Sequence, residues 1–158
     1  MKKIIKKVYC DTSVIGGIAD NEFSEYSKRF FTYVKSGFFN LVLSPVVDDE
    51  INSEGTPEEV IKEYEGLIKH SEIVAVTQDA IELQQAYLNA KILTTKWEDD
   101  ALHVSLASVN NCDYIVSWNF KHIVNFQKIP LYNAVNKLNG YGEIQIFSPL
   151  ELEVNDEE

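Results

Sequence analysis

The sequence predicts a single α/β domain in which helices cover both faces of a central, mainly parallel sheet of five strands. Short apolar runs alternate with longer amphipathic stretches, a pattern typical of parallel strands joined by crossover helices. The expected strands are apolar throughout rather than at alternate positions, as in sheets buried on both faces. The length of 158 residues suits one domain with one core.

In the first part of the chain, a helix separates two apolar strands. The strand at 8–10 is followed by a helix at 22–36, in which aromatic residues recur with helical spacing and after which Gly37 suits the cap. The second strand covers 41–43, and Pro45 suits the first position of the next helix. A helix between the strands is what parallel pairing requires.

The rest of the chain repeats this alternation. Thr56 to Glu59 matches a capping box that includes a proline, and Thr95 to Glu98 matches a second one. The remaining elements are expected as strands at 73–76, 114–116 and 144–147 and as helices from 57 on, at 79–90 and at 95–109.

Composition excludes several classes of protein. The chain has 14 Lys and Arg against 25 Asp and Glu, a formal net charge of -11, which argues against holding nucleic acid by bulk charge. Cys10 and Cys112 are too few for a disulfide framework or a zinc cage. No apolar run reaches the roughly 20 residues of a membrane-spanning helix, and no targeting segment is evident. We therefore expect a cytoplasmic protein without membrane association.

The composition changes clearly at one place. Residues 151–158 contain five acids and no base, which is typical of a solvated tail. We expect a folded domain at 1–150 and an acidic C-terminal tail at 151–158.

Acidic residues recur where the strands of the predicted sheet end. Asp11 follows the first strand, Glu50 lies in the helix after the second, and Asp99 and Asp100 lie in the helix before the fourth. Sites in such sheets form beyond the carboxyl ends of the strands. Because like charges held together repel, a divalent cation with oxygen ligands is a natural partner for such a cluster. Two such ions can activate a water and stabilise a phosphodiester leaving oxygen.

Each of these acids also has an ordinary interpretation. Helical spacing places Glu50 on the buried face of its helix, but it also suits a surface acid at a helix edge. Asp99 and Asp100 are not distinguished by spacing and also suit the positive helix N-terminus. Asp11 suits a cap or turn. A haloacid-dehalogenase-type phosphotransfer site also begins with such an aspartate, but it expects a second one where this chain has Ser13.

Four segments of the chain carry a resemblance. They lie at 8–14, 44–51, 100–107 and 112–122, and the last contains Ser-Trp-Asn-Phe-Lys-His. In this order and spacing they resemble the PIN domain, the fold of VapC-like toxin ribonucleases of bacterial toxin–antitoxin pairs, and the last motif resembles a subgroup of small prokaryotic PIN proteins. The resemblance covers roughly residues 4–150. It implies a three-layer sandwich with a Mg²⁺- or Mn²⁺-dependent nuclease site.

The resemblance also assigns roles by position. It implies that Asp11, Glu50 and Asp100 are metal ligands and catalytic residues. A fourth acid of the family falls on Asn119, which can still ligate through its carbonyl but brings no charge, so a second metal should bind more weakly. Residues that look suited to orient the acids or contact phosphate are Thr12, Ser13, Asp99 and Ser117.

Other side chains near these positions have two interpretations each. His103, one turn after Asp100, suits either support of the metal site or a hydrogen-bonded place in the core. Lys121 and His122 suit either contact with a phosphate backbone or a solvated loop. Trp97 and Trp118 suit either stacking on a base or packing beside the sheet.

The leading functional prediction is a metal-dependent ribonuclease, and the resemblance implies that it is the toxin of a type II toxin–antitoxin pair. Its expected partners are an RNA substrate, an antitoxin protein and a second copy of the chain. The aromatic-rich stretch at 30–39 suits either a dimer surface or a place in the core. Asn119 motivates the alternative, a PIN-like binding module with a weakened metal site. A metal-dependent phosphatase on a similar sheet is a third interpretation.

Overall fold

The computed structural model describes residues 4–155 and has a five-stranded, all-parallel sheet at its centre. The strand order is β3-β2-β1-β4-β5, which confirms the predicted fold class. The strands are β1 (Lys6–Cys10), β2 (Phe39–Leu43), β3 (Ser71–Ile73), β4 (Tyr114–Val116) and β5 (Gln145–Phe147).

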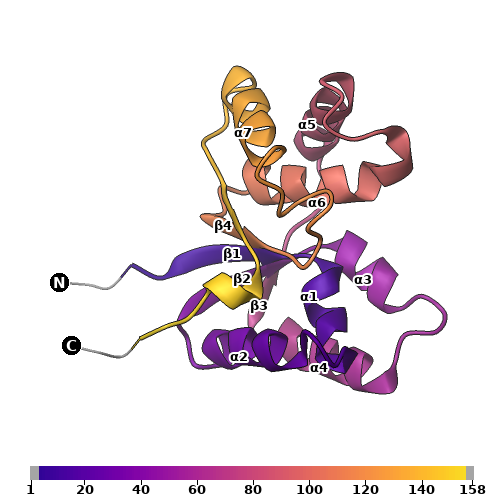
Figure 1. The fold of residues 1–158 in the computed structure, drawn as a ribbon, viewed down its shortest axis with the longest axis vertical. Helices are drawn as coiled ribbons and strands as arrows, with labels where there is room; N and C mark the ends of the chain where they lie inside the picture. Colours follow the sequence, from indigo (N-terminus) through magenta and orange to yellow (C-terminus); the bar gives the residue numbers. More distant parts are fainter. Residues whose placement is uncertain (1–3, 156–158) are drawn as a thin grey trace.

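The helices form a layer on each side of the sheet (Figure 1). One layer contains α1 (Thr12–Gly16), α2 (Ser24–Lys35), α3 (Pro45–Ile51) and α4 (Glu58–Ile68). The other contains α5 (Gln78–Asn89), α6 (Glu98–Val109) and α7 (Ile129–Leu138). Short 3-10 turns lie at η1 (Gly17–Ala19), η2 (Thr95–Trp97) and η3 (Pro149–Glu151).

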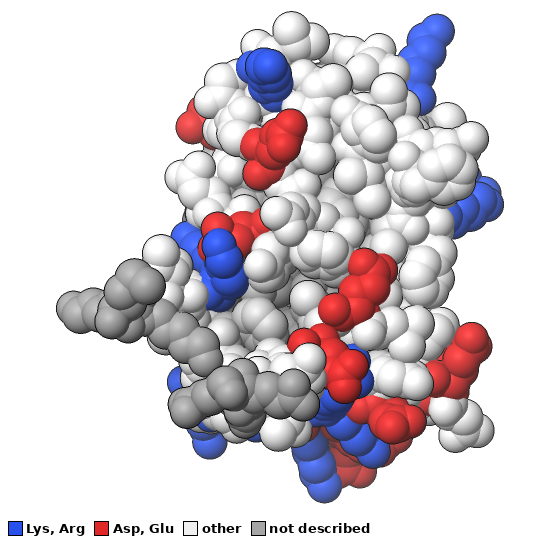
Figure 2. Space-filling view, turned by 60° about the vertical axis from the view of Figure 1, so that its left-hand side comes forward, with Lys and Arg blue, Asp and Glu red and all other residues white. Residues whose placement is uncertain are grey.

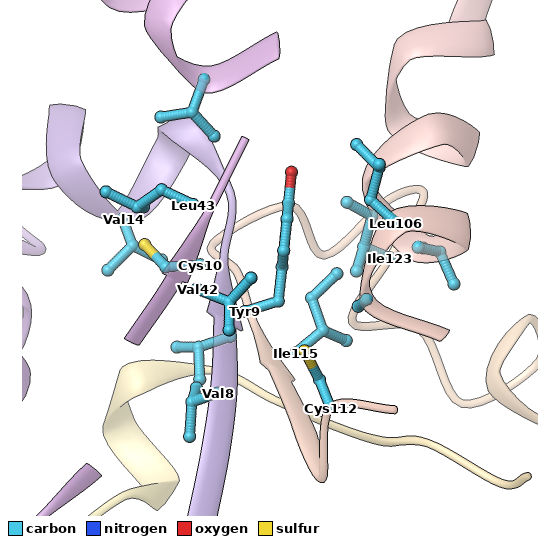
Figure 3. Close-up of a cluster of buried hydrophobic side chains, with 14 of the residues drawn as sticks. Val8, Tyr9, Cys10, Val14, Val42, Leu43, Leu106, Cys112, Ile115 and Ile123 are labelled. Carbon is cyan, nitrogen blue, oxygen red and sulfur yellow. The ribbon is translucent and has the colours of Figure 1, made fainter. Parts of the chain in front are cut away.

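The core is built on both faces of the central strand β1. Val8, Tyr9 and Cys10 are completely buried. Because successive side chains of a strand point to opposite faces, Val8 and Cys10 lie toward the α1 side, whereas Tyr9 reaches toward α6 (Figure 3). Residues 101–108 of α6 are all buried, as expected for a helix enclosed between a sheet and further helices. This burial fixes the position of α6 beside β1.

Several predicted boundaries were wrong. The third strand lies at 71–73, where it pairs with β2 at the sheet edge, and not at 73–76. Neither capping box forms, because the Thr56 hydroxyl donates to the Ser53 carbonyl and α6 begins at Glu98 without a side-chain cap. Helices α1 and α7 were not predicted. Gly37 has φ +84°, the left-handed conformation expected after a helix.

The last described residues run along α2. The Arg29 guanidinium donates to the carbonyls of Pro149 and Leu150, Leu152 is buried, and the Val154 N–H donates to the Tyr33 hydroxyl. The proposed division at residue 150 remains a prediction, and residues 156–158 of the expected tail lie outside the described part of the chain.

The surface charges on the face shown in Figure 2 are of both signs, most densely at the end formed by α2 and α4. Ion pairs lie there between Lys35 and Glu63 at 2.9 Å and between Lys62 and Glu58 at 3.3 Å. Phe30 and Phe31, from the stretch considered for dimer formation, are buried in the core. Within residues 4–155, no helix is long and apolar enough to cross a membrane.

Candidate active site

The strand order creates a topological switch point between β1 and β4. The chain builds β1, β2 and β3 in one direction and then returns to place β4 and β5 on the other side of β1. The connections that leave β1 and β4 therefore diverge, and ligands of open α/β sheets bind at such a switch point. Asp11 directly follows β1, and its N–H donates to the carbonyl of Val116 at 3.3 Å. The first predicted acid thus lies at this switch point.

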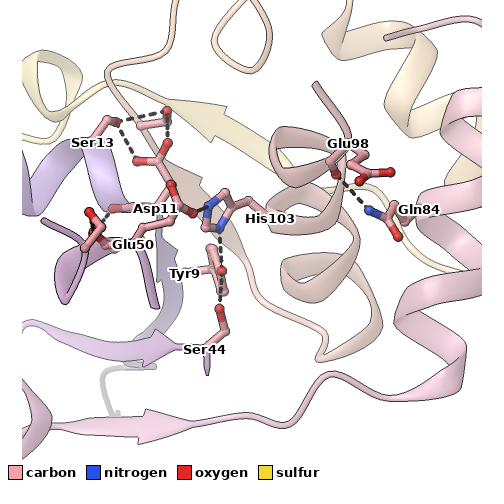
Figure 4. Close-up of polar contacts among 11 residues, drawn as sticks. Tyr9, Asp11, Ser13, Ser44, Glu50, Gln84, Glu98 and His103 are labelled. Carbon is pink, nitrogen blue, oxygen red and sulfur yellow. Dashed lines mark hydrogen bonds and ion pairs between the residues drawn. The ribbon is translucent and has the colours of Figure 1, made fainter. Parts of the chain in front are cut away.

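The carboxylate of Asp11 is buried and firmly oriented. Only 3% of the residue is exposed, and its two oxygens accept hydrogen bonds from the hydroxyls of Ser13 and Ser117, each at 2.6 Å (Figure 4). Burial raises the pKa of Asp11, and the charge of His103 and the two serine hydrogen bonds only partly offset this. Ser13 and Ser117 therefore hold both oxygens of this carboxylate in place.

A buried chain of hydrogen bonds leads to Glu50. The Glu50 carboxylate lies 2.9 Å from His103 Nε2, His103 Nδ1 lies 2.7 Å from the Tyr9 hydroxyl, and that hydroxyl lies 2.8 Å from Ser44 Oγ (Figure 4). A carboxylate only accepts, so Nε2–H donates to Glu50. With a neutral imidazole, Tyr9 then donates to Nδ1 and accepts from Ser44. Glu50 is thus held by His103, which is itself fixed by Tyr9 and, through it, by Ser44.

His103 is close enough to all three predicted acids to be affected by their charges. Burial lowers its pKa, but the hydrogen bond to Glu50 and the charges of Asp11, Glu50 and Asp100 outweigh this effect, so its pKa is raised overall. The charge of Asp100 likewise raises the pKa of Asp11. Acids from three distant segments therefore share one electrostatic environment around a buried histidine.

Asp100 is the inward-facing member of the acidic first turn of α6. It binds His122 Nδ1 at 2.9 Å with its side chain 21% exposed, whereas Asp99 is exposed on the outer side of the helix. His122 is buried and carries this contact, so it does not lie on a solvated loop. Its ring packs against Trp97 with 4.5 Å between centroids. Asp100 and His103, one turn apart, thus bind partners on different segments.

Asn119 stabilises the loop after β4. Its side-chain carbonyl accepts from the His122 N–H at 2.9 Å, and its own N–H donates to Ser117 Oγ at 2.9 Å. Ser117 in turn donates to Asp11. Asn119 is therefore connected to Asp11 through one serine, and it fixes the loop that carries His122.

Glu50 lies at the edge of its helix. The fully buried side of α3 is formed by Val47 and Ile51, while the Glu50 side chain is 41% exposed. The seven-residue helix is too short for helical spacing to place each residue reliably on a buried arc. Glu50 thus reaches the site from the side, where it meets His103.

The chemical type of these residues suits a divalent cation. Asp11, Glu50 and Asp100 supply hard carboxylate oxygens, and the Thr12 hydroxyl after Asp11 is buried without a hydrogen-bond partner in the described chain. However, Glu50 and Asp100 are each turned to a histidine, and among residues 4–155 no three Asp, Glu, His or Cys side chains are arranged to hold one ion.

Sequence reasoning missed Tyr9 and Ser44 as parts of this site. Tyr9 lies within the strand expected at 8–10, and no role was assigned to it. The available signal was its hydroxyl, which needs a hydrogen-bond partner when buried. Trp118 is a core residue, stacked on Phe23 at 4.1 Å and donating to Ser27 at 2.8 Å. Lys121 is exposed beside Trp97.

Comparison with known proteins places the fold. No protein-family model and no curated protein matches the sequence. Among solved structures, Mycobacterium tuberculosis VapC20, described as a sarcin–ricin loop cleaving toxin, is similar with a TM-score of 0.57 and 14% identity over 87% of this chain and 98% of that one. A chain of the DNA-bound VapBC complex from Salmonella typhimurium has a TM-score of 0.57 and 18% identity over 91% of this chain and 98% of its own.

A chain of FitAcB from Neisseria gonorrhoeae has a TM-score of 0.59 and 11% identity, covering 92% of this chain and 99% of its own. The three neighbours match nearly the whole length of both chains. The protein therefore has the fold of the VapC-type toxins, which confirms the fold that the resemblance to PIN domains predicts.

Proposed function

We propose that this protein is a metal-dependent ribonuclease and that it is the toxin of a toxin–antitoxin pair. The observation that carries the proposal is the common environment of Asp11, Glu50 and Asp100 around His103, next to the switch point of the sheet. The fold supports it, because one protein with the same fold is described as cleaving the sarcin–ricin loop. The overall acidity is compatible with a site that reaches phosphate through a cation.

Asp11, Glu50 and Asp100 would hold Mg²⁺ or Mn²⁺, with Asn119 assisting. A bound ion would supply the Lewis acid that activates the attacking water and stabilises the departing 3′ oxygen of the phosphodiester. The chain's own residues orient the ligands. Ser13 and Ser117 fix Asp11, and the Nε2–H of His103 holds Glu50.

Two further side chains support this arrangement. His122 holds Asp100, and its backbone N–H is fixed by Asn119. Every acid is thus oriented by a side chain from another segment, which suits the precise positioning that catalysis requires.

The test is an RNA cleavage assay with structured and unstructured RNA, in Mn²⁺ and in EDTA. We expect cleavage in Mn²⁺, none in EDTA, and loss of activity in Asp11→Asn and Asp100→Asn. Asp49→Asn is the matched control, since Asp49 is an exposed acid beside Glu50 on α3. Cleavage that persists in both site variants or in EDTA would indicate a contaminating nuclease.

A second candidate function is a PIN-like binding module without strong activity. Asn119 favours it, because this residue brings no charge and its carbonyl already accepts a hydrogen bond from the loop. This candidate predicts protein that binds Mn²⁺ but cleaves none of the RNAs in the same assay. Release of phosphate from small phosphomonoesters would instead indicate a phosphatase.

The proposed protein partner is an antitoxin. One of the neighbours is a chain of a complex named VapBC, and another is a chain of a complex named FitAcB. With a net charge of -11, this protein would attract a partner segment rich in Lys and Arg. Co-purification with the product of a neighbouring reading frame, and inhibition of the Mn²⁺-dependent cleavage by that product, would test this pairing.

A further inference from the structure

A half-buried aromatic ring lies beside the proposed catalytic acids. Trp97 ends η2 immediately before α6, and its ring packs on His122, the side chain that binds Asp100 at 2.9 Å. Trp97 is therefore one side chain away from Asp100. The other tryptophan, Trp118, is buried by its contacts with Phe23 and Ser27. Only Trp97 of the two is accessible to a ligand.

Two exposed lysines extend over the Trp97 ring from different segments. Lys96 Nζ lies 5.0 Å and Lys121 Nζ 5.7 Å from the ring centroid. Lys96 precedes Trp97 in η2, whereas Lys121 belongs to the loop after β4. Contacts of this kind between an exposed ammonium and a ring are weak. An incoming base can therefore displace the lysines from the ring, and their charges are then free to meet phosphates.

The charges around Trp97 are too mixed to bind nucleic acid by themselves, so stacking on the ring has to contribute to the affinity. Glu98 and Asp99 are exposed in the turn that follows Trp97, and they repel phosphates. Two lysines among these acids do not make a broad basic surface. A ring flanked by single positive charges instead suits a short stretch of nucleic acid, held by stacking and by one or two phosphate contacts.

We propose that Trp97, Lys96 and Lys121 form a platform that binds one unpaired RNA base, with the lysines contacting the phosphates beside it. The proposal rests on the proposed ribonuclease function and narrows its substrate to single-stranded segments, such as loops, bulges and ends. A base within a duplex is covered on both sides by its neighbours, so it cannot lie on the ring, whereas an unpaired base exposes its face.

The experiment measures RNA binding to the full chain in EDTA, where cleavage is blocked. The probes are a fluorescently labelled oligouridine and a blunt-ended RNA duplex of the same length. We expect Trp97→Leu to weaken oligouridine binding by about five-fold or more, whereas Trp97→Phe retains most of the affinity because it keeps an aromatic face. The duplex should bind more weakly than the oligouridine and respond little to either substitution.

The lysines are tested by the dependence of binding on salt. Lys96→Gln and Lys121→Gln should each reduce the slope of log K against log salt by about 0.7, the value for one phosphate contact on a single strand. Lys28→Gln, an exposed lysine on α2 in the other helical layer, should change neither slope nor affinity. Circular dichroism melting curves establish that each variant is folded.

The outcomes separate the platform from the proposed function. Normal oligouridine affinity in folded Trp97→Leu, with Mn²⁺-dependent cleavage intact, would overturn the platform and leave the ribonuclease standing. Equal loss in Trp97→Leu and Trp97→Phe would also overturn it, because stacking would not be the cause. Loss of binding to an antitoxin but not to RNA would identify a protein-docking surface instead. Wild-type protein that neither binds nor cleaves RNA would overturn both proposals.

Discussion

His103 shows how a single buried side chain determines the geometry of the proposed site. It is 2% exposed and bonds Glu50 on one side and Tyr9 on the other. Removing it leaves the Tyr9 hydroxyl without one of its partners, and a buried polar group without a partner costs about 1–3 kcal/mol. We expect His103→Leu to lower the free energy of unfolding, measured in urea, by an amount in this range and to abolish cleavage.

Two comparisons distinguish this role from simple packing. Tyr9→Phe removes one hydroxyl from the chain but leaves His103 beside Glu50, so we expect it to retain more activity than His103→Leu. Ser44→Ala combined with Tyr9→Phe should be less destabilising than the two single losses added together, because both atoms belong to one hydrogen-bonded network. Strict additivity would contradict a connected chain from Ser44 to His103.

Cys112 gives a prediction about pH that is independent of the site. Burial raises the pKa of Cys112 to about 12, from 9.0 for a thiol exposed to solvent. An acid whose pKa is higher in the folded state contributes full stability below its unfolded pKa, and that stability is lost as the pH rises between the two values. The free energy of unfolding should therefore fall above about pH 9, the unfolded pKa of a cysteine, and Cys112→Ala should reduce this slope.

The same shift predicts slow chemistry at the thiol. The thiolate is the reactive form, so alkylation of Cys112 by iodoacetamide at neutral pH should require unfolding. Mass spectrometry of the native protein should show Cys112 unmodified, and of the protein in denaturant fully modified. Rapid labelling of the native protein would contradict the burial of this residue.

At the scale of elements, the close contact between η1 and the loop after β4 is possible because Gly17 has no side chain. A Cβ added at Gly17 would lie 2.6 Å from Ser27 Oγ and 2.8 Å from Trp118 Nε1. These two atoms form the hydrogen bond that anchors Trp118 on α2. The backbone of Gly17 is itself helical, with φ -60°, so steric contact alone opposes a larger residue.

We therefore expect Gly17→Ala to destabilise the protein by about 1–3 kcal/mol, as is usual for overpacking. Gly16→Ala is the matched control, because the neighbouring glycine is also helical and its added Cβ would meet nothing within 4 Å. This control should be neutral or stabilising by up to about 1 kcal/mol. Thermal unfolding of both variants measures the difference, and equal effects would contradict the close packing of η1 on Trp118.

At the scale of the whole molecule, the sequence predicts the sheet far better than it predicts the pairing of side chains. Continuous apolar runs identified the regions of β1, β2, β4 and β5, since burial on both faces leaves that pattern. They misplaced β3, whose residues Ser71–Ile73 lie at the sheet edge and are not buried. Helix α1 has only five residues, too few to show a period. Helix α7 has a proline in its first turn, where it is tolerated, although proline usually signals a break.

The sequence predicts at which edge of the sheet the site lies, but it does not predict which side chains bind one another there. Asp11 and Glu50 follow strands, so the rule for parallel sheets places them near one another. Asp100 and His103 are one helical turn apart, a spacing that suggests that the two side chains bind each other. Each instead binds a partner that lies 22 or 53 residues away in the sequence. Such pairings are set by how α3, α6 and the loop after β4 pack, which spacing along one helix does not reveal.

The stability of the whole molecule should respond to divalent cations if the three acids hold one. A ligand that binds only the folded state stabilises it by about 2.7 kcal/mol at one hundred times its dissociation constant. For a chain of this length, that corresponds to a rise of roughly 5–10 °C in melting temperature. Breaking the contacts of Glu50 with His103 and of Asp100 with His122 would reduce the gain.

We expect Mn²⁺ to raise the melting temperature of the wild type and of Asp49→Asn, but not of Asp11→Asn, Glu50→Gln or Asp100→Asn. Comparing each variant with and without the ion removes any effect of the substitution on the metal-free protein. This matters for Asp11, because Asp11→Asn removes a buried charge and also replaces one of the two oxygens that accept hydrogen bonds from Ser13 and Ser117. An equal rise in all variants would place the ion away from these acids, and the proposed catalytic role of the three carboxylates would then lose its basis.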